Sequence, residues 1–331
     1  MSGFEHRHAA HCESGTVSAL LRHRGLHLSE PMVFGIGSGL FFIHVPFIKV
    51  GGIPLTAYRG PPRYIINTVC KRLGIKLHQA RYRSETQGMQ ALDRLLERGT
   101  PVGLQTSVYW LPYFPVDLRF QFNAHNLVAF GKRDGEYWLS DPIAENVVTC
   151  PADDLRRARF AKGVFAPKGL IYYPERVPTA PDIDGAVRLA LRDVARRMVA
   201  IPLPVMGVRG IRYLANRIER WPQQYGAARA KSYVSSVVRM QEEIGTGGAG
   251  FRFMYAAFLQ EAGARLGLAA LTDASQQLTA AGDRWREFAV AGARICKAPA
   301  AHADAYRELS AILHDCAARE ERIFRSILAA L

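Results

Sequence analysis

The stretch His11-Cys12-Glu13-Ser14-Gly15 decides how this sequence is interpreted. Cys12 stands at the start of a predicted helix, because apolar residues follow it with the i, i+3, i+4 spacing of one buried helical face. These residues are Val17, Leu20 and Leu21. A thiol in the first turn meets unpaired N–H groups and the positive end of the helix, which favour the thiolate. We therefore interpret Cys12 as a nucleophile.

A later hairpin supplies a base and an acid. Residues 124–131 predict a strand, and residues 136–142 predict its antiparallel partner. With a turn centred on Arg133, His125 and Asp141 become cross-strand neighbours whose Cβ atoms lie about 4.5–5.5 Å apart. Histidine can take the thiol proton, and the carboxylate can hold the ring in one tautomer. The order of the three residues, with a cysteine on an early helix, is that of papain-like enzymes.

Each of these residues also has an ordinary structural explanation. Cys12 can be a small buried apolar residue, and Asp141 followed by Pro142 can simply end a strand. His125 can be a strand histidine with no chemical role. The three together in this order favour catalysis. An acyl-enzyme also needs donors for the oxyanion, and the backbone N–H of Cys12 is one of them. Papain-like enzymes usually supply another from a glutamine several residues before the cysteine, but no glutamine precedes Cys12 here. His6 or His8 could take that position.

Composition excludes several classes of protein. The chain has 331 residues, of which 49% are hydrophobic, and a net charge of +14 without any block of like charge. That pattern predicts acidic partners rather than a nucleic-acid arm. The five cysteines are scattered without metal or disulfide spacing, which fits a reducing cytoplasm. The apolar run at 32–50 is interrupted by glycine and proline, and no signal peptide is visible, so we expect a cytoplasmic protein with no metal site and no membrane segment.

The sequence changes character near residue 178. Three prolines between residues 174 and 181 indicate a linker, and helical periodicity dominates from residue 182 onward. We therefore predict an α+β chain with two domains. The first comprises residues 1–178 and mixes helices with strands, and the second, residues 179–331, is all-α.

Several motifs closely resemble the butirosin-biosynthesis protein H family. They are residues 11–15, residues 28–35, and the hairpin from His125-Asn126 to Asp141-Pro142. Residues 243–255 resemble a helical domain of unknown function that often follows this family's N-terminal domain. The namesake moves an aminoacyl group from an acyl carrier protein thioester to an amine of an aminoglycoside. The resemblance implies a papain-like fold related to the double-glycine leader peptidases, with Cys12, His125 and Asp141 as the catalytic triad.

The resemblance implies an acyltransferase of specialised metabolism that works through a Cys12 acyl-enzyme. The expected partners are an acyl carrier protein and a small amine or hydroxyl acceptor, with no nucleic acid and no membrane, and the helical domain is the candidate surface for a homodimer. No cofactor is expected beyond the phosphopantetheine that the carrier delivers. Candidate substrate-binding residues are His11, Glu30, Tyr109, Trp110 and Arg252. The alternatives are a cysteine hydrolase (peptidase, amidase or thioesterase) and a non-catalytic scaffold.

Overall fold

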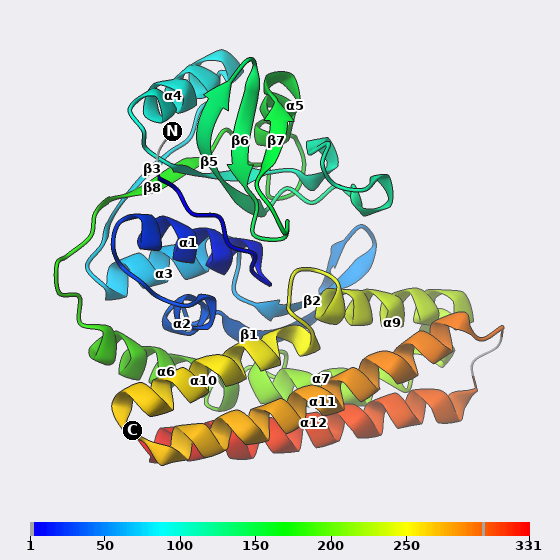
Figure 1. The fold of residues 1–331 in the computed structure, drawn as a ribbon. Helices are drawn as coiled ribbons and strands as arrows, with labels where there is room; N and C mark the ends of the chain where they lie inside the picture. Colours follow the sequence, from blue (N-terminus) through cyan, green and yellow to red (C-terminus); the bar gives the residue numbers. More distant parts are fainter. Residues whose placement is uncertain (1–2, 300–301) are drawn as a thin grey trace. The chain divides into compact units, whose positions relative to one another are not determined.

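The computed structural model describes residues 3–299 and 302–331, which divide into two compact units. One unit contains the residues up to Val33 together with Pro62–Asp182. The other contains Phe34–Pro61 and Ile183–Leu331. The predicted α+β class with a helical C-terminal region is confirmed (Figure 1). No helix in the described ranges combines the length and the apolar character that a membrane crossing needs.

The first unit is built on a six-stranded antiparallel sheet in the order β3-β8-β4-β5-β6-β7. The strands are β3 (Lys76–Ala80), β4 (Val102–Thr106), β5 (His125–Arg133), β6 (Glu136–Ser140), β7 (Val148–Pro151) and β8 (Ile171–Arg176). Its helices are α1 (Cys12–His23), α3 (Tyr64–Arg72), α4 (Glu85–Glu97) and α5 (Ala152–Arg159), with short 3-10 turns at Val108–Trp110 and Val116–Leu118. Helix α2 (Glu30–Ile36) begins in this unit and ends in the other.

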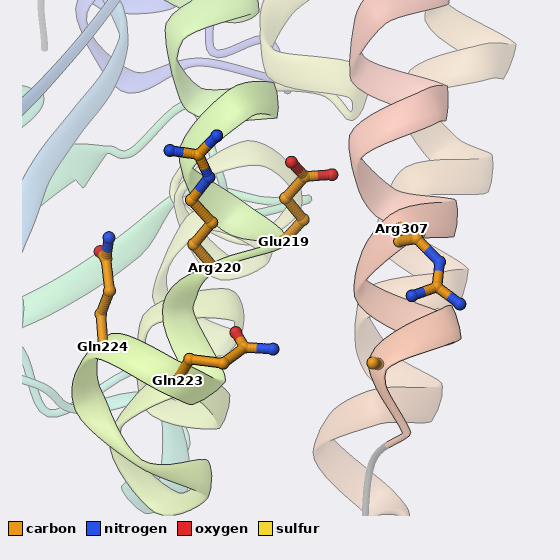
Figure 2. A pocket seen from close by; sticks show the side chains of 6 residues that line it. Glu219, Arg220, Gln223, Gln224 and Arg307 are labelled. Atoms are coloured by element: carbon orange, nitrogen blue, oxygen red, sulfur yellow. The ribbon is translucent and has the colours of Figure 1, made fainter.

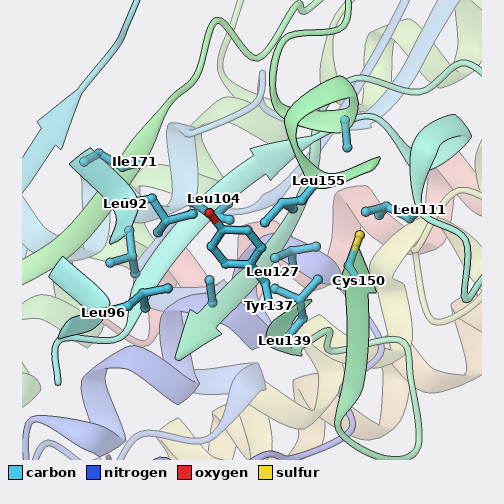
Figure 3. Packing of buried hydrophobic residues seen from close by; sticks show 13 residues of the cluster. Leu92, Leu96, Leu104, Leu111, Leu127, Tyr137, Leu139, Cys150, Leu155 and Ile171 are labelled. Atoms are coloured by element: carbon cyan, nitrogen blue, oxygen red, sulfur yellow. The ribbon is translucent and has the colours of Figure 1, made fainter. Parts of the chain in front are cut away.

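The two faces of this sheet pack against different elements. One face carries the main apolar core, in which side chains from β4 and β5 meet those of α4 and α5 (Figure 3). Leu104 and Leu127 lie on that face. Because side chains alternate along a strand, Gly103 and Asn126 lie on the opposite face. Helix α1 packs against β4, β5 and β8, and Asn126 approaches the side chain of Cys12, so α1 covers this opposite face.

The second unit combines helices with one β-hairpin. Its hairpin consists of β1 (Leu40–Val50) and β2 (Ile53–Arg59). Its helices are α6 (Ile183–Val199), α7 (Gly207–Ile218), α8 (Trp221–Tyr225), α9 (Ala227–Glu242), α10 (Arg252–Leu266), α11 (Ala269–Lys297) and α12 (Ala303–Ala329), with a 3-10 turn at Ala249–Phe251. Helices α10, α11, α12 and α7 pack successively against one another.

The predicted division into residues 1–178 and 179–331 needs a correction. The structure places Phe34–Pro61 with the C-terminal helices and puts the later boundary at Asp182. The cause is packing: the ring of Phe34 stacks on Phe251 with 5.0 Å between centroids, and the N–H of His44 donates to the Val205 carbonyl at 2.9 Å. These contacts join segments that are far apart in the sequence, so local periodicity could not reveal them.

The prediction that Arg252 binds substrate also needs a correction. It is completely buried inside the helical unit. Its Nε and Nη2 donate to the two carboxylate oxygens of Glu320, both at 2.9 Å, and its Nη1 donates to the Gly250 carbonyl at 2.9 Å. The indole of Trp285 donates to the same carboxylate at 2.6 Å. A buried charge with this set of partners has a structural role.

We expect Arg252→Leu to lower the free energy of unfolding by about 3–5 kcal/mol, because it leaves the Glu320 carboxylate buried without its counter-ion. Urea unfolding followed by far-UV circular dichroism measures this loss. Arg239→Ala is the control, since Arg239 forms an exposed pair with Glu243 that is worth at most about 1 kcal/mol. Equal effects of the two substitutions would contradict the structural role of Arg252.

Candidate active site

Cys12 is the first residue of α1, as predicted. His11 precedes the helix with an extended backbone, and its side chain accepts a hydrogen bond from the Ser14 N–H. Cys12 therefore lies at the positive end of a 12-residue helix, where backbone N–H groups lack helical partners. Its side chain is only 5% exposed. The position of Cys12 is thus set by the start of a helix, and the residue is largely shielded from water.

Two carboxylates hold the segment around Cys12 in place. Glu30 accepts hydrogen bonds from the N–H groups of Ala10 and His11 at 2.9 and 2.8 Å, and from the Ser14 hydroxyl at 3.1 Å. Burial raises the pKa of Glu30, although these hydrogen bonds partly oppose that effect. The donors that Glu30 binds belong to the chain itself. Glu30 and His11 thus order the loop that carries Cys12, and their binding of substrate stays a prediction.

The second carboxylate belongs to Glu13 and is almost completely buried. It accepts hydrogen bonds from the N–H groups of Arg63, Ile65 and Ile66 at 3.1, 3.0 and 3.3 Å. These donors lie at the start of α3, which has no capping side chain of its own. A negative charge is favourable at a helix N-terminus. Glu13 therefore joins α1 to α3, a function that the sequence does not reveal.

Gly15 permits the closest contact between α1 and the segment after β6. A Cβ atom at residue 15 would lie 2.8 Å from the Cβ of Pro142 and 2.6 Å from that of Ala9. The Ala9 N–H also donates to the Pro142 carbonyl at 2.7 Å. Because Pro142 directly follows Asp141, this contact brings the first turn of α1 to the acid of the predicted triad.

His125 and Asp141 form a buried pair. Nε2 of His125 lies 2.7 Å from Oδ2 of Asp141, and the two side chains are 2% and 0% exposed. The Tyr113 hydroxyl donates to the same carboxylate oxygen at 2.7 Å, and the Ile143 N–H donates to the other at 3.1 Å. The ring of Phe114 contacts the imidazole edge-on at 5.6 Å between centroids. The Asp141 carboxylate thus accepts hydrogen bonds at both oxygens, and the imidazole is held in one orientation.

The charges of this pair stabilise each other. Burial alone would lower the pKa of His125, but the negative charge and hydrogen bond of Asp141, together with a hydrogen bond to Cys12, raise it to about 10. Burial alone would raise the pKa of Asp141, but His125, Tyr113 and the Ile143 N–H outweigh burial and lower it. Since Asp141 occupies Nε2, Nδ1 is the ring nitrogen available to Cys12. An imidazolium in this position can give a proton to a leaving group.

The register of the hairpin differs from the prediction. The turn consists of Asp134 and Gly135, both with positive φ, and is not centred on Arg133. An irregularity between Ala129 and Gly131 then moves the pairing one residue back toward the predicted register. Strand β6 ends at Ser140, so Asp141 follows the strand and is not a paired residue opposite His125. The predicted contact nevertheless occurs, because the two side chains can span the shift in register.

Tyr109 and Trp110, which we also predicted to bind substrate, lie at the end of the sheet where β5 begins. Tyr109 and Trp110 follow β4 and are exposed, with their rings edge-to-face at 5.1 Å. The guanidinium of Arg157 lies over the Trp110 ring at 5.3 Å. His6, a candidate second oxyanion donor, contacts the Ser140 hydroxyl and the Ala144 carbonyl at 2.7 and 3.1 Å. His6 thus fastens the N-terminal segment to the end of β6.

An open pocket of about 430 Å³ lies elsewhere, in the helical unit (Figure 2). The described residues that line it are Glu219, Arg220, Gln223, Gln224, Ala303 and Arg307. None of these six residues can act as a nucleophile with a neighbouring base. Among the residues that the structure describes, no three His, Cys, Asp or Glu side chains gather as a metal site either. The Cys12 region is therefore the candidate site for chemistry.

We expect Gly15→Ala to destabilise the protein by about 1–3 kcal/mol, because its methyl group overlaps Pro142. The sign is diagnostic, since glycine to alanine inside a helix normally stabilises by about 1 kcal/mol. Alkylation of Cys12 by iodoacetamide should change as well, because α1 must shift. Urea unfolding and peptide mass mapping measure the two effects. Gly131→Ala, where the nearest atom to the new Cβ is 3.7 Å away, is the control. A stabilised Gly15→Ala protein would contradict this contact.

The buried pair also predicts how stability depends on pH. The raised pKa of His125 stabilises the fold fully below its ordinary value of 6.5, and this contribution is lost as pH rises through about 10. The lowered pKa of Asp141 contributes above its ordinary value of 3.8 and is lost as pH falls through the folded value. Asp141→Asn should therefore cost most between about pH 4 and 6.5, and progressively less toward pH 10.

Urea unfolding at several pH values between 4 and 10 measures this trend. Asp134→Asn, at an exposed position of the hairpin turn, is the matched control and should show no such trend. A cost of Asp141→Asn that stays constant over the whole range would contradict the charged pair.

Two family models and a solved structure match parts of this chain. Residues 11–142 match the family described as butirosin biosynthesis protein H, N-terminal, and residues 153–327 match a domain of unknown function, DUF4872. A search of curated proteins finds no match. A crystal structure described as a C39-like peptidase from Bacillus anthracis is 15% identical, with a TM-score of 0.40, and the match covers 54% of this chain and 98% of that one. The chain belongs to the DUF4872 family and carries a butirosin biosynthesis protein H N-terminal domain before it.

Proposed function

We propose that this protein is a cysteine acyltransferase that takes an acyl group from a carrier-protein thioester and gives it to an amine or hydroxyl acceptor. The observation that carries the proposal is the placement of Cys12 at the start of α1 beside the buried His125–Asp141 pair. A thiolate at a helix N-terminus next to an imidazolium is an activated nucleophile.

In the first step, Sγ of Cys12 attacks the carbonyl carbon of the thioester. The tetrahedral intermediate collapses, the bond to the carrier sulfur breaks, and Nδ1 of His125 gives its proton to that sulfur. The product is a thioester on Cys12, so one carbon–sulfur bond replaces another. Asp141 keeps its charge throughout and holds the imidazole by Nε2 at 2.7 Å.

In the second step, the amine or hydroxyl acceptor attacks the Cys12 thioester. The neutral imidazole accepts the acceptor's proton at Nδ1, a carbon–nitrogen or carbon–oxygen bond forms, and the thiolate of Cys12 leaves. His125 thereby returns to its charged form, in accord with the raised pKa that Asp141 gives it. With an amine acceptor, amide formation drives the cycle forward, since an amide is more stable than a thioester.

The surface around the candidate site supports a large donor. Of the described residues in the first unit, the exposed large apolar side chains all lie in the loops and 3-10 turns at the end of the sheet where β5 begins and β6 ends. They are Tyr109, Trp110, Val116, Leu118, Ile143, Val147, Val164 and Phe165. Exposed apolar groups gathered at one end of a sheet are typical of a binding surface. A chain with a net charge of +14 also attracts an acidic partner such as a carrier protein.

Membership of the family supports transfer over hydrolysis. The matched family is named for butirosin biosynthesis, which is a biosynthetic context. A transferase must also shield its acyl-enzyme from water. The low exposure of Cys12, His125 and Asp141 is consistent with that requirement. Hydrolysis to the free acid uses the same residues and is the alternative that an experiment must separate.

The first experiment is incubation of the full-length protein with a panel of acyl carrier proteins charged with different acyl thioesters, followed by intact mass spectrometry. We expect the wild-type protein to gain the mass of an acyl group and Cys12→Ala to gain none. Cys296→Ala is the control, because Cys296 is the most exposed of the other cysteines. An acyl mass that persists in Cys12→Ala would contradict Cys12 as the nucleophile.

Adding amines to the acylated protein then separates the alternatives. A transferase loses the acyl mass as an amide product appears, at a rate that depends on amine concentration. A thioesterase releases free acid at a rate that is independent of added amine. No adduct with any thioester in the panel would favour the scaffold interpretation.

A further inference from the structure

We propose that Asn126 is an additional catalytic residue whose side-chain amide stabilises the Cys12 thiolate. The proposal deepens the function described above and rests on Cys12 as the nucleophile. Nδ2 of Asn126 lies 4.0 Å from Sγ of Cys12. That distance is at the outer limit for a hydrogen bond to sulfur, so a neutral thiol gains little from the contact. A charged sulfur attracts the N–H more strongly and gains more.

The orientation of the Asn126 amide is determined by its other partners. The Tyr172 hydroxyl donates to Oδ1 at 2.8 Å, and Nδ2 donates to the Ala124 carbonyl at 3.0 Å. A carbonyl can only accept, so exchanging the amide oxygen and nitrogen would place two acceptors against each other. The nitrogen therefore faces both Ala124 and Cys12. One N–H binds the carbonyl, and the second is available to the sulfur.

Tyr172 is itself held in place as a donor. Burial raises the pKa of its hydroxyl well above the ordinary range, and the charges of Glu13 and Cys12 add to this effect, so the hydroxyl keeps its proton. Its ring lies over Gly103, the residue opposite it in β4, and a Cβ there would be 2.2 Å from the ring. Gly103, Tyr172, Asn126 and Cys12 thus contact one another in succession across four elements of the first unit, β4, β8, β5 and α1.

The position of Asn126 complements that of His125. The two residues are neighbours in β5, and their side chains leave the strand on opposite faces. Both side chains nevertheless interact with Cys12. Asn126 is 2% exposed, so water does not compete strongly for its N–H. The thiolate would then be stabilised by the helix N-terminus, by an imidazolium and by an amide together.

The test is the rate of Cys12 alkylation by iodoacetamide as a function of pH, measured by peptide mass mapping of the full-length protein. Alkylation occurs at a saturated carbon and forms no oxyanion, so it reports the thiolate alone. We expect Asn126→Ala to slow alkylation at pH 7 and to move the rate–pH curve to higher pH. A tenfold loss of thiolate gives about a threefold lower rate, because a more basic thiolate is more nucleophilic.

Tyr172→Phe keeps the ring but removes the hydroxyl that orients the amide, and we expect a shift in the same direction that is smaller. This variant preserves the test if Asn126→Ala does not fold. Asn67→Ala is the matched control, because Asn67 is an exposed amide of α3 whose side chain binds only Gln79 among the hydrogen bonds of the described residues. Its alkylation curve should equal that of the wild type.

A second probe distinguishes the thiolate function from an oxyanion function. Acylation of Cys12 by p-nitrophenyl acetate passes through a tetrahedral oxyanion, and loss of an oxyanion donor typically slows such a step about 10²- to 10³-fold. If Asn126→Ala leaves the alkylation curve unchanged but slows acylation to this extent, the proposal is overturned and the amide serves the oxyanion. An unchanged curve with unchanged acylation also overturns it.

The result that would reject the proposed acyltransferase differs from the result that would reject the function of Asn126. A wild-type protein that is alkylated at Cys12, yet gains no acyl mass from any carrier thioester, would reject the acyltransferase while the effect of Asn126 on alkylation stands. A wild-type Cys12 that iodoacetamide does not modify at all would overturn the proposal for Asn126.

Discussion

The contact between the first turn of α1 and Pro142 is the constraint on which the candidate site depends. It exists because residue 15 has no side chain, since a Cβ there would overlap Pro142. The N–H of Ala9 donates to the same proline's carbonyl at 2.7 Å and closes the contact from the other side. The thiol of Cys12, carried by a helix, is thereby brought to the His125–Asp141 pair at the end of the sheet. Thiol chemistry needs contact distances, so the position of the whole helix governs the site.

Three hydrogen-bonded carboxylates hold that arrangement together. Removing a carboxylate from water is costly unless hydrogen bonds replace the water, and Glu13, Glu30 and Asp141 each accept at least three hydrogen bonds. Glu13 binds the start of α3, Glu30 binds the loop before Cys12, and Asp141 binds His125. Because each acid is engaged within the unit, the site is organised before a substrate arrives, which is what electrostatic stabilisation of a reaction requires.

Neither of the two units is a single continuous stretch of the sequence. The chain leaves the first unit after Val33, forms a hairpin that belongs to the helical unit, and returns at Pro62 before any strand of the large sheet is made. The helical unit has its own buried ion pair, between Arg252 and Glu320, beneath Trp285. Its core therefore includes a segment of sequence that lies between Cys12 and His125, and it cannot be treated as a simple C-terminal addition.

Residue types and spacing alone predicted the α+β class, the helix that starts at Cys12, and most helices and strands, because helical and strand periodicity are local properties of a sequence. They also indicated Cys12, His125 and Asp141, whose catalytic role stays a prediction. The register beyond Ala129, the unit to which residues 34–61 belong, the burial of Arg252 and the approach of Asn126 to Cys12 were decided only by the tertiary structure. Each of these depends on which distant segments pack together, and a bulge, a close contact or a buried counter-ion leaves no periodic signal in the chain.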